Sequence, residues 1–184
     1  LGHYVLPAKS AFEKWDATFF SLTFPETTFQ IRRPCCEALG DPLEEGEIFT
    51  RLADELGLLP EIPQSLLQAA NGDRKEFATK LMKWISKDKR SARLLPFIGE
   101  KTLGQNLKSA HLAAVWGLLV MYPQHAADEL VRAGYELTPF LGNDLFQKLL
   151  DCPGGILIGK LDPDKNLEKL RTPDKKIHLY IEEM

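Results

Sequence analysis

The spacing of apolar positions predicts helices through the middle of the chain. Apolar residues recur every three or four positions over 48–56 and 77–85, as expected for helices with one buried face. Shorter helices are predicted over 64–70, 94–98, 124–133 and, from Asn143 or Asp144, to Leu150. The most apolar run, 111–121, is far shorter than the roughly 20 residues of a membrane-spanning helix. It predicts a central buried helix that stops at Tyr122–Pro123.

Capping residues mark several helix ends. Asp41 followed by Pro42 predicts a helix start, because an aspartate can cap free amides and proline fits the first helical position. Gly57 should end that helix, and Gly134 should end the one over 124–133. Asp73 should cap the helix over 77–85. The charged run at 87–90 is interpreted as a solvated turn between helices, with a docking patch as the alternative.

The two ends of the chain predict strands. Residues 28–32 alternate polar and apolar side chains, which directs Phe29 and Ile31 to a core. Residues 4–6 are predicted to be extended. Residues 156–161 and 176–181 are strand-like, separated by a helical turn over 164–170, and pair with each other or with the N-terminal strands. The expected class is therefore α+β and predominantly α-helical, with antiparallel helix pairs and a few short strands from the N- and C-terminal segments.

Three segments are distinguished along the chain. Residues 1–60 contain strands and the capped helix, 61–151 form a helical subdomain, and 152–184 form a C-terminal strand pair. The length of 184 residues suits one compact unit made of all three. The chain begins at Leu1 without a methionine or a secretory signal, which indicates a piece of a larger polypeptide or an engineered or processed end.

Composition and charge narrow the possible partners. Hydrophobic residues make up 44% and charged residues 27%, as in globular proteins. With 23 basic and 26 acidic side chains the net charge is −3, which favours neither nucleic acid nor a membrane surface. The cysteines Cys35, Cys36 and Cys152 do not suit a disulfide framework, so we expect a reducing, cytoplasmic environment.

Motifs for catalysis or metal binding are absent from the sequence. There is no G-x-S-x-G elbow, no phosphate-binding loop and no H-E-x-x-H, and the four histidines lie in separate segments. His111 is interpreted as a helix-end residue rather than a ligand. An aromatic cluster near the N-terminus is interpreted as packing, with a stacking platform for a planar ligand as the alternative; its members are Phe12, Trp15, Phe19, Phe20 and Phe24.

A family resemblance adds to this picture. The residues that carry it are Tyr4-Val5-Leu6-Pro7-Ala8, Ser10, Phe12-Glu13-Lys14, Ala17-Thr18-Phe19, Gln30, Leu39-Gly40, Glu47-Ile48, Leu52-Ala53 and Leu56-Gly57. Together they resemble a stretch of the molybdopterin oxidoreductase superfamily. The tail from Arg171-Thr172-Pro173-Asp174 to Ile177-His178-Leu179 is similar to its formate dehydrogenase-like branch. Ala17 stands where the family commonly has glycine.

The resemblance implies a fragment of a molybdenum enzyme. In the parent, molybdopterin guanine dinucleotide would hold molybdenum and an iron–sulfur cluster would accompany it, while the metal ligands would lie outside this chain. The matched polar positions Glu13, Thr18 and Gln30 are then candidate cofactor-binding residues, with capping and strand pairing as the alternative roles. No catalytic residue and no metal ligand is assigned here. The isolated chain is expected to be inactive and to bind no cofactor, and its partners would be the remaining domains of the parent.

A second hypothesis comes from a different class of protein. The chain would be a self-standing helical module for protein interaction or scaffolding. Its expected mark is an exposed apolar patch formed by the helices around 112–121 or 77–85.

Overall fold

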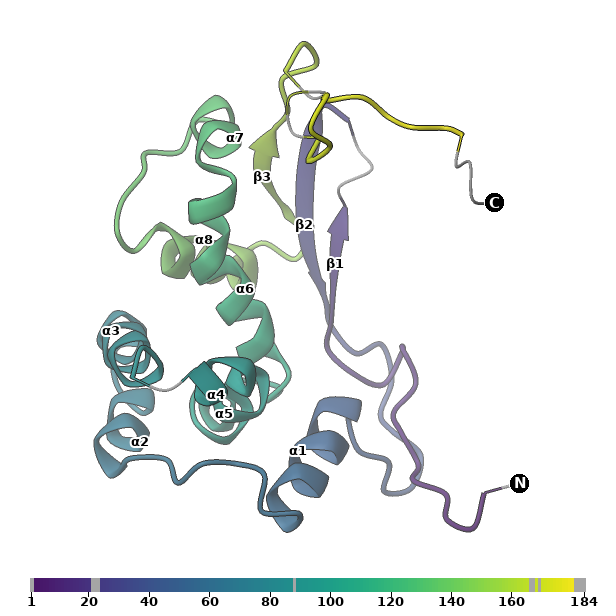
Figure 1. Ribbon diagram of the computed structural model, residues 1–184. Helices are drawn as coiled ribbons and strands as arrows, with labels where there is room; N and C mark the ends of the chain where they lie inside the picture. The colour runs from purple at the N-terminus through teal and green to yellow at the C-terminus, as the bar shows by residue number, and fades with distance from the viewer. Residues whose placement is uncertain (1, 21–23, 88, 166–167, 169, 181–184) are drawn as a thin grey trace.

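The computed structural model describes residues 2–20, 24–87, 89–165, 168 and 170–180. Over these residues it contains eight α-helices, one short 3₁₀ helix and three strands, which confirms a mostly helical α+β fold. The helices form most of the molecule and the sheet lies along one side of them (Figure 1). In these described parts of the chain, no helix combines the length and the apolar character needed to cross a membrane.

The sheet joins the two ends of the chain. Strands β1 (Asp16–Phe20), β2 (Glu26–Arg32) and β3 (Ile156–Lys160) are antiparallel, in the order β1-β2-β3. The prediction for 28–32 is confirmed, and Phe29 and Ile31 are buried. Strand β3 pairs with the N-terminal strand β2. Of the two pairings predicted for residues 156–161, the one with an N-terminal strand is therefore the one that forms. The first segment of the chain is thus hydrogen-bonded to the last.

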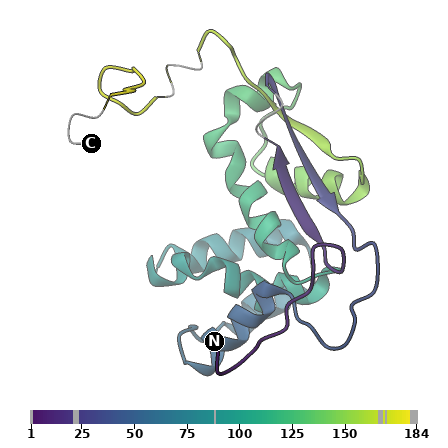
Figure 2. The ribbon, with the colours of Figure 1, turned by 90° about the vertical axis from the view of Figure 1, so that its right-hand side faces the viewer.

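The strand predicted over 176–181 is not formed. Residues 176–180 have no regular structure and project away from the body of the molecule (Figure 2), and residue 181 lies outside the described residues. Side chains cover β3 instead, because Arg132 Nε donates to the carbonyl of Lys160 at 2.8 Å and the Tyr135 hydroxyl to that of Leu157 at 2.7 Å. Of the helical turn predicted over 164–170, the structure describes a turn at 163–165 and a 3₁₀ conformation at 168, and residues 166, 167 and 169 lie outside the described residues.

The helices follow in chain order. They are α1 (Glu45–Glu55), α2 (Gln64–Ala70), α3 (Arg74–Ile85), α4 (Lys89–Arg93), α5 (Leu95–Lys101), the 3₁₀ helix η1 (Leu103–Asn106), α6 (Leu112–His125), α7 (Ala127–Arg132) and α8 (Leu141–Asp151). The cap at Asp73 is confirmed, since its carboxylate accepts from the amide of Lys75 at 3.0 Å. Gly57 and Gly134 end their helices with positive φ, as predicted.

The start predicted for α1 is wrong. The helix begins at Glu45, and neither Asp41 nor Pro42 belongs to it. Leu43 instead forms a parallel bridge with Ala8: its carbonyl accepts from the amide of Lys9 at 2.9 Å, and its amide donates to Pro7 at 3.1 Å. These bonds hold Leu43 in an extended conformation, so the helix can begin only after it.

Two further helix boundaries differ from prediction. The charged run at 87–90 is not simply a turn, because α4 begins at Lys89. Helix α6 also passes Pro123 and ends at His125. Pro123 lies in the last turn, and the hydrogen bonds resume beyond it where Ala126 donates to the carbonyl of Tyr122 at 3.0 Å. A proline this close to a helix end leaves little of the helix to disrupt.

The core forms around α6, which packs against α5 and α8. Leu112, Trp116 and Leu119 of α6 are buried, as expected for a central helix. Phe77 of α3 contacts Trp116 with their ring centroids 5.3 Å apart. All three cysteines are free thiols, in agreement with the absence of a disulfide framework.

Candidate functional site

The three candidate cofactor-binding residues occupy two places in the structure. Thr18 and Gln30 lie directly opposite each other in the pairing of β1 with β2. The Gln30 side-chain amide donates to the carbonyl of Pro153 at 3.1 Å, just before β3. Two of the three predicted positions are therefore neighbours on one ladder.

Glu13 lies in the N-terminal arm, residues 2–15, which precedes β1. Its Oε2 accepts from the amide of Ser10 at 2.7 Å and its Oε1 from the amide of Leu39 at 3.2 Å. The hydrogen bonding from Ser10 is the largest cause that lowers the pKa of the Glu13 carboxyl, and the bond from Leu39 lowers this pKa further. Glu13 thereby fastens the arm to the loop that leads into α1.

The arm and α1 together expose many large apolar side chains. We call this set the arm–α1 surface: Tyr4, Val5, Leu6, Phe12, Phe49, Leu52 and Leu56. The two elements are joined by the Ala8–Leu43 bridge and by the ion pair between Lys14 and Glu45 at 2.6 Å. Large apolar side chains exposed on two elements that are bonded to each other are available for contact with another protein surface.

The helices named by the interaction-module hypothesis do not form that surface. Phe77 and Leu81 of α3 are buried, as are Val115 and Leu119 of α6. Leu118 is the main exception, with 66% of its surface exposed. The exposed apolar side chains of the described chain lie chiefly on α1, on the arm and in the tail rather than on these two helices.

A group of carboxylates lies where α1, α5 and the start of α6 meet. Glu44, the residue before α1, accepts a hydrogen bond from Ser109 and lies 3.9 Å from the ammonium of Lys9. On α1 itself, Glu47 pairs with Arg51, and Asp54 pairs with Lys101 of α5 at 2.6 Å. The bond from Lys14 is the largest cause of the lowered pKa of Glu45. Each of these carboxylates has a cation beside it.

Glu100 of α5 stands apart in this group. Its side chain is 7% exposed, and its Oε2 accepts a hydrogen bond from the Thr50 hydroxyl of α1. Its Oε1 is buried and has no hydrogen-bond partner among the described residues. Burial raises the pKa of Glu100, against the opposing effects of the bond from Thr50 and the nearby His111.

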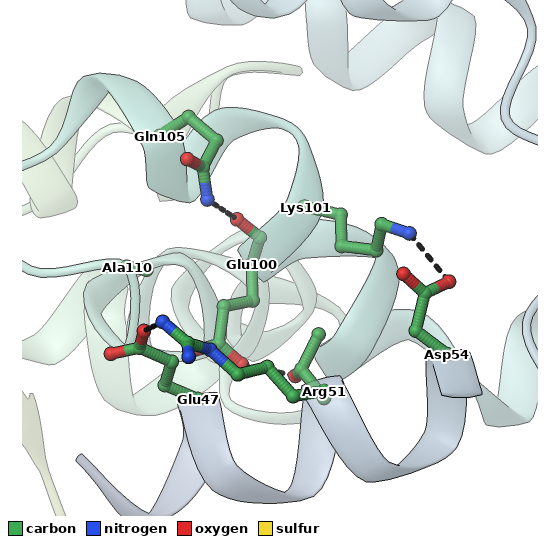
Figure 3. A pocket seen from close by; sticks show the side chains of 8 residues that line it. Glu47, Arg51, Asp54, Glu100, Lys101, Gln105 and Ala110 are labelled. Atoms are coloured by element: carbon green, nitrogen blue, oxygen red, sulfur yellow. Dashed lines mark hydrogen bonds and ion pairs between the residues drawn. The ribbon is translucent and has the colours of Figure 1, made fainter. Parts of the chain in front are cut away.

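Glu100 lies between two cavities. One, of about 390 Å³, has charged and polar walls that include Glu47, Arg51 and Lys101 (Figure 3). On this side Gln105 donates to the backbone carbonyl of Glu100 at 3.0 Å. The other, which we call the apolar cavity, has a volume of about 330 Å³ and walls formed largely by Phe49, Pro96, Phe97, Ala110 and Ala114. Both volumes fall within the range of small-molecule sites.

The lining of the apolar cavity is completed by Glu45, Gly46 and His111. His111 precedes α6, as predicted for a helix-end residue, and its ring also lines the cavity. A Cβ atom at Gly46 would lie 3.3 Å from both carboxylate oxygens of Glu100 and 3.5 Å from Nδ1 of His111. The carboxylate and the imidazole therefore face the same point of α1, and they pack closely against Gly46, which leaves little room for a larger side chain at this position.

Sequence reasoning did not identify this site. Its signal is modest: Glu100 is a single acidic residue that directly follows the apolar stretch 94–99. Its burial depends on α1 and on residues 109–111, which are distant in sequence. Within the described residues, no group of three or more His, Cys, Asp or Glu side chains is arranged to hold a metal ion.

Comparisons with known proteins do not identify a family for this chain. No protein-family model, no curated protein and no solved structure matches the chain.

Proposed function

We propose that this chain is a structural part of a molybdopterin-dependent oxidoreductase of the formate dehydrogenase-like branch. It would pack around the cofactor domains of the parent enzyme in the cytoplasm and would be inactive alone. The molybdopterin guanine dinucleotide with its molybdenum, and the iron–sulfur cluster, would be held by the remaining domains. When bound, the cofactor supplies the two-electron chemistry, and this chain contributes to positioning.

The observation that supports this proposal is the position of the arm–α1 surface. The arm and α1 carry much of the resemblance, and the same two elements expose Tyr4, Val5, Phe49 and Leu56. A surface of this kind is stabilised when another domain covers it, because burial removes apolar area from water. The proposal assigns that role to the remaining domains of the parent.

In this proposal, the side of the chain that faces the cofactor carries Glu13, Thr18 and Gln30. The pairing of Thr18 with Gln30 gives a rigid ladder from which a hydroxyl and an amide could contact a polar cofactor edge. Glu13 would act by fixing the arm, through its bonds from Ser10 and Leu39.

The first test identifies the polypeptide that contains this sequence. An antibody raised against the chain would isolate that polypeptide from its natural source for mass and metal analysis. We expect a longer polypeptide with a C-x-x-C-x-x-x-C run before these residues, a pterin-binding domain after them, and stoichiometric molybdenum and iron. A polypeptide limited to these 184 residues and free of molybdenum would contradict the proposal and favour the self-standing module.

A second test uses two leucines of similar exposure. Leu56 lies on the arm–α1 surface and is 70% exposed, whereas Leu118 of α6 is 66% exposed and lies outside it. In the parent, Leu56→Lys should weaken domain packing, seen as faster limited proteolysis and lower molybdenum content, and Leu118→Lys should not. In the isolated chain both variants should keep the stability of the original within about 0.5 kcal/mol. Equal effects of the two variants in the parent would argue against a covered arm–α1 surface.

A further inference from the structure

Two cysteines lie next to each other in the loop between β2 and α1. Cys35 and Cys36 are both free and exposed, and they follow shortly after the end of β2 at Arg32. The two residues line one open hollow of about 470 Å³ together with Lys9, Glu13, Pro34, Glu37 and Ala38. Neighbouring thiols that open onto one hollow can bind one ligand through two sulfur atoms, which a single cysteine cannot do.

The backbone of this cysteine pair is held in place by the arm. The carbonyl of Phe12 accepts from the amide of Cys35 at 2.7 Å and from the amide of Cys36 at 3.3 Å. Three residues further along, the amide of Leu39 donates to Oε1 of Glu13 at 3.2 Å. The arm therefore fixes the loop both at the cysteines and just after them, so a ligand would not have to order this segment when it binds.

The thiol groups, in contrast, make only weak contacts. Sγ of Cys35 lies 3.9 Å from the carbonyl oxygen of Arg33, and Sγ of Cys36 lies 3.7 Å from that of Phe12. A thiol is a weak hydrogen-bond donor, so these contacts contribute little. Rotation of either exposed side chain between staggered positions therefore costs little, and both sulfur atoms can turn toward one ligand in the hollow.

A direct bond between the two sulfur atoms would be strained. Consecutive Cα atoms are about 3.8 Å apart across an ordinary trans peptide, below the range of about 4.4–6.8 Å that is usual in disulfides. An ion bound between the sulfur atoms lets them stay further apart than the length of a disulfide bond, which is about 2.05 Å. The pair is thus better suited to hold one ion than to form a mutual disulfide.

The number of available ligands decides which ion suits the pair. Thiolates are soft ligands, which favour Cu(I), Zn²⁺ and iron–sulfur clusters. Structural zinc takes four protein ligands, and the clusters are usually held by four cysteines. In the parts of the chain that the structure describes, no third His, Cys, Asp or Glu joins this pair in a group that could hold a metal. Of these candidates, Cu(I) is the one that two thiolates satisfy, because it accepts a linear, two-coordinate geometry.

We propose that Cys35 and Cys36 bind one Cu(I) ion between them in the hollow beside the arm. Each thiol releases its proton and forms one copper–sulfur bond, so two protons leave, copper stays in the +1 state and no electron is transferred. The lining also favours a cation over an anion, because it contains two carboxylates, Glu13 and Glu37, and one ammonium, Lys9. The copper site does not depend on the proposed oxidoreductase role, so either can fail without the other.

The first test titrates the unmodified, fully reduced chain with Cu(I) in the absence of oxygen. The copper would be supplied as its coloured complex with bicinchoninate, whose loss of absorbance reports transfer to the chain. We expect one copper per monomeric chain on gel filtration, two sulfur neighbours in the X-ray absorption spectrum, and tighter binding as the pH rises, because two protons are released. Copper that stays with the chelator, or that is shared between two chains, would overturn the proposal.

Matched variants then identify the ligands, with circular dichroism to check that each variant keeps its fold. Cys35→Ser and Cys36→Ser each remove one thiolate and keep a side chain of similar size. Each should weaken Cu(I) binding more than about 100-fold, since loss of a residue that only supports a metal ligand already costs about 10–100-fold. Cys152 does not line the hollow, so Cys152→Ala should change the affinity by less than about threefold. Unchanged affinity in Cys35→Ser or Cys36→Ser, or an equal loss in Cys152→Ala, would refute the assignment.

Discussion

The indole N–H of Trp116 donates a hydrogen bond to Oδ1 of Asn143 at 2.8 Å inside the core. Trp116 lies in the middle of α6 and Asn143 near the start of α8, and both are buried. Burial of two polar groups is tolerated because each satisfies the other. The bond therefore fixes how α8 lies along α6.

Removal of one partner should be costly. In Asn143→Leu the side chain keeps a similar size but no longer accepts the bond, so the Trp116 N–H becomes a buried, unpaired donor. We expect the free energy of unfolding to fall by about 1–3 kcal/mol, measured by urea denaturation. Trp116→Phe removes the donor, and the double variant should lose less than the sum of the two single losses. Simple additivity would show that the bond contributes nothing of its own.

The contact between α6 and α8 also depends on Gly142. A Cβ atom there would lie 2.3 Å from the carbonyl oxygen of Leu119 and 2.5 Å from Cα of Val120, so it would collide with the backbone of α6. Gly142→Ala should force the helices apart and lower the free energy of unfolding by about 1–3 kcal/mol or more. Urea denaturation would measure the loss.

Gly117 provides the control for this prediction. It lies within α6, and a Cβ atom there would have no neighbouring atom within 4 Å. Gly117→Ala should therefore raise the free energy of unfolding by about 0.5–1 kcal/mol, because alanine has the higher helix propensity. Similar changes in the two variants would mean that the close approach of Gly142 to α6 is not a constraint.

Local signals made part of this fold predictable. Asp73 caps α3 through the adjacent amide of Lys75, and the left-handed conformations at Gly57 and Gly134 depend on the glycines themselves. The alternation of polar and apolar residues over 28–32 likewise predicted that Phe29 and Ile31 form the buried face of a strand. In each case the residues that determine the structure are close together in sequence.

Features that depend on distant residues could not be predicted. Asp41 has the sequence of a helix cap, but the bridge from Ala8 to Leu43 delays the helix. Phe49 and Leu56 follow the spacing of a buried face, yet periodicity does not show whether any element covers that face. The polar character of Glu100 gave no sign of burial, because its surroundings are assembled from α1 and the start of α6.

The buried carboxyl of Glu100 should make stability depend on pH. Its pKa is raised above the usual 4.5, chiefly by burial, so the folded protein holds this proton at pH values where the unfolded chain has released it. Its contribution to stability is then fully present below about pH 4.5 and is lost as the pH rises through the folded-state pKa. Glu100→Gln cannot ionise and still accepts a hydrogen bond from Thr50.

The free energy of unfolding of Glu100→Gln, relative to the original, should therefore increase as the pH rises from about 4 and level off above the folded-state pKa. Each unit by which that pKa is raised corresponds to about 1.4 kcal/mol of difference at the plateau. Urea denaturation at a series of pH values would measure it. Glu47→Gln is the control: this carboxylate is more exposed and paired with Arg51, so its difference should stay within about 1 kcal/mol over the same range. A Glu100→Gln curve parallel to that of the original would show that burial imposes no penalty on the charged form.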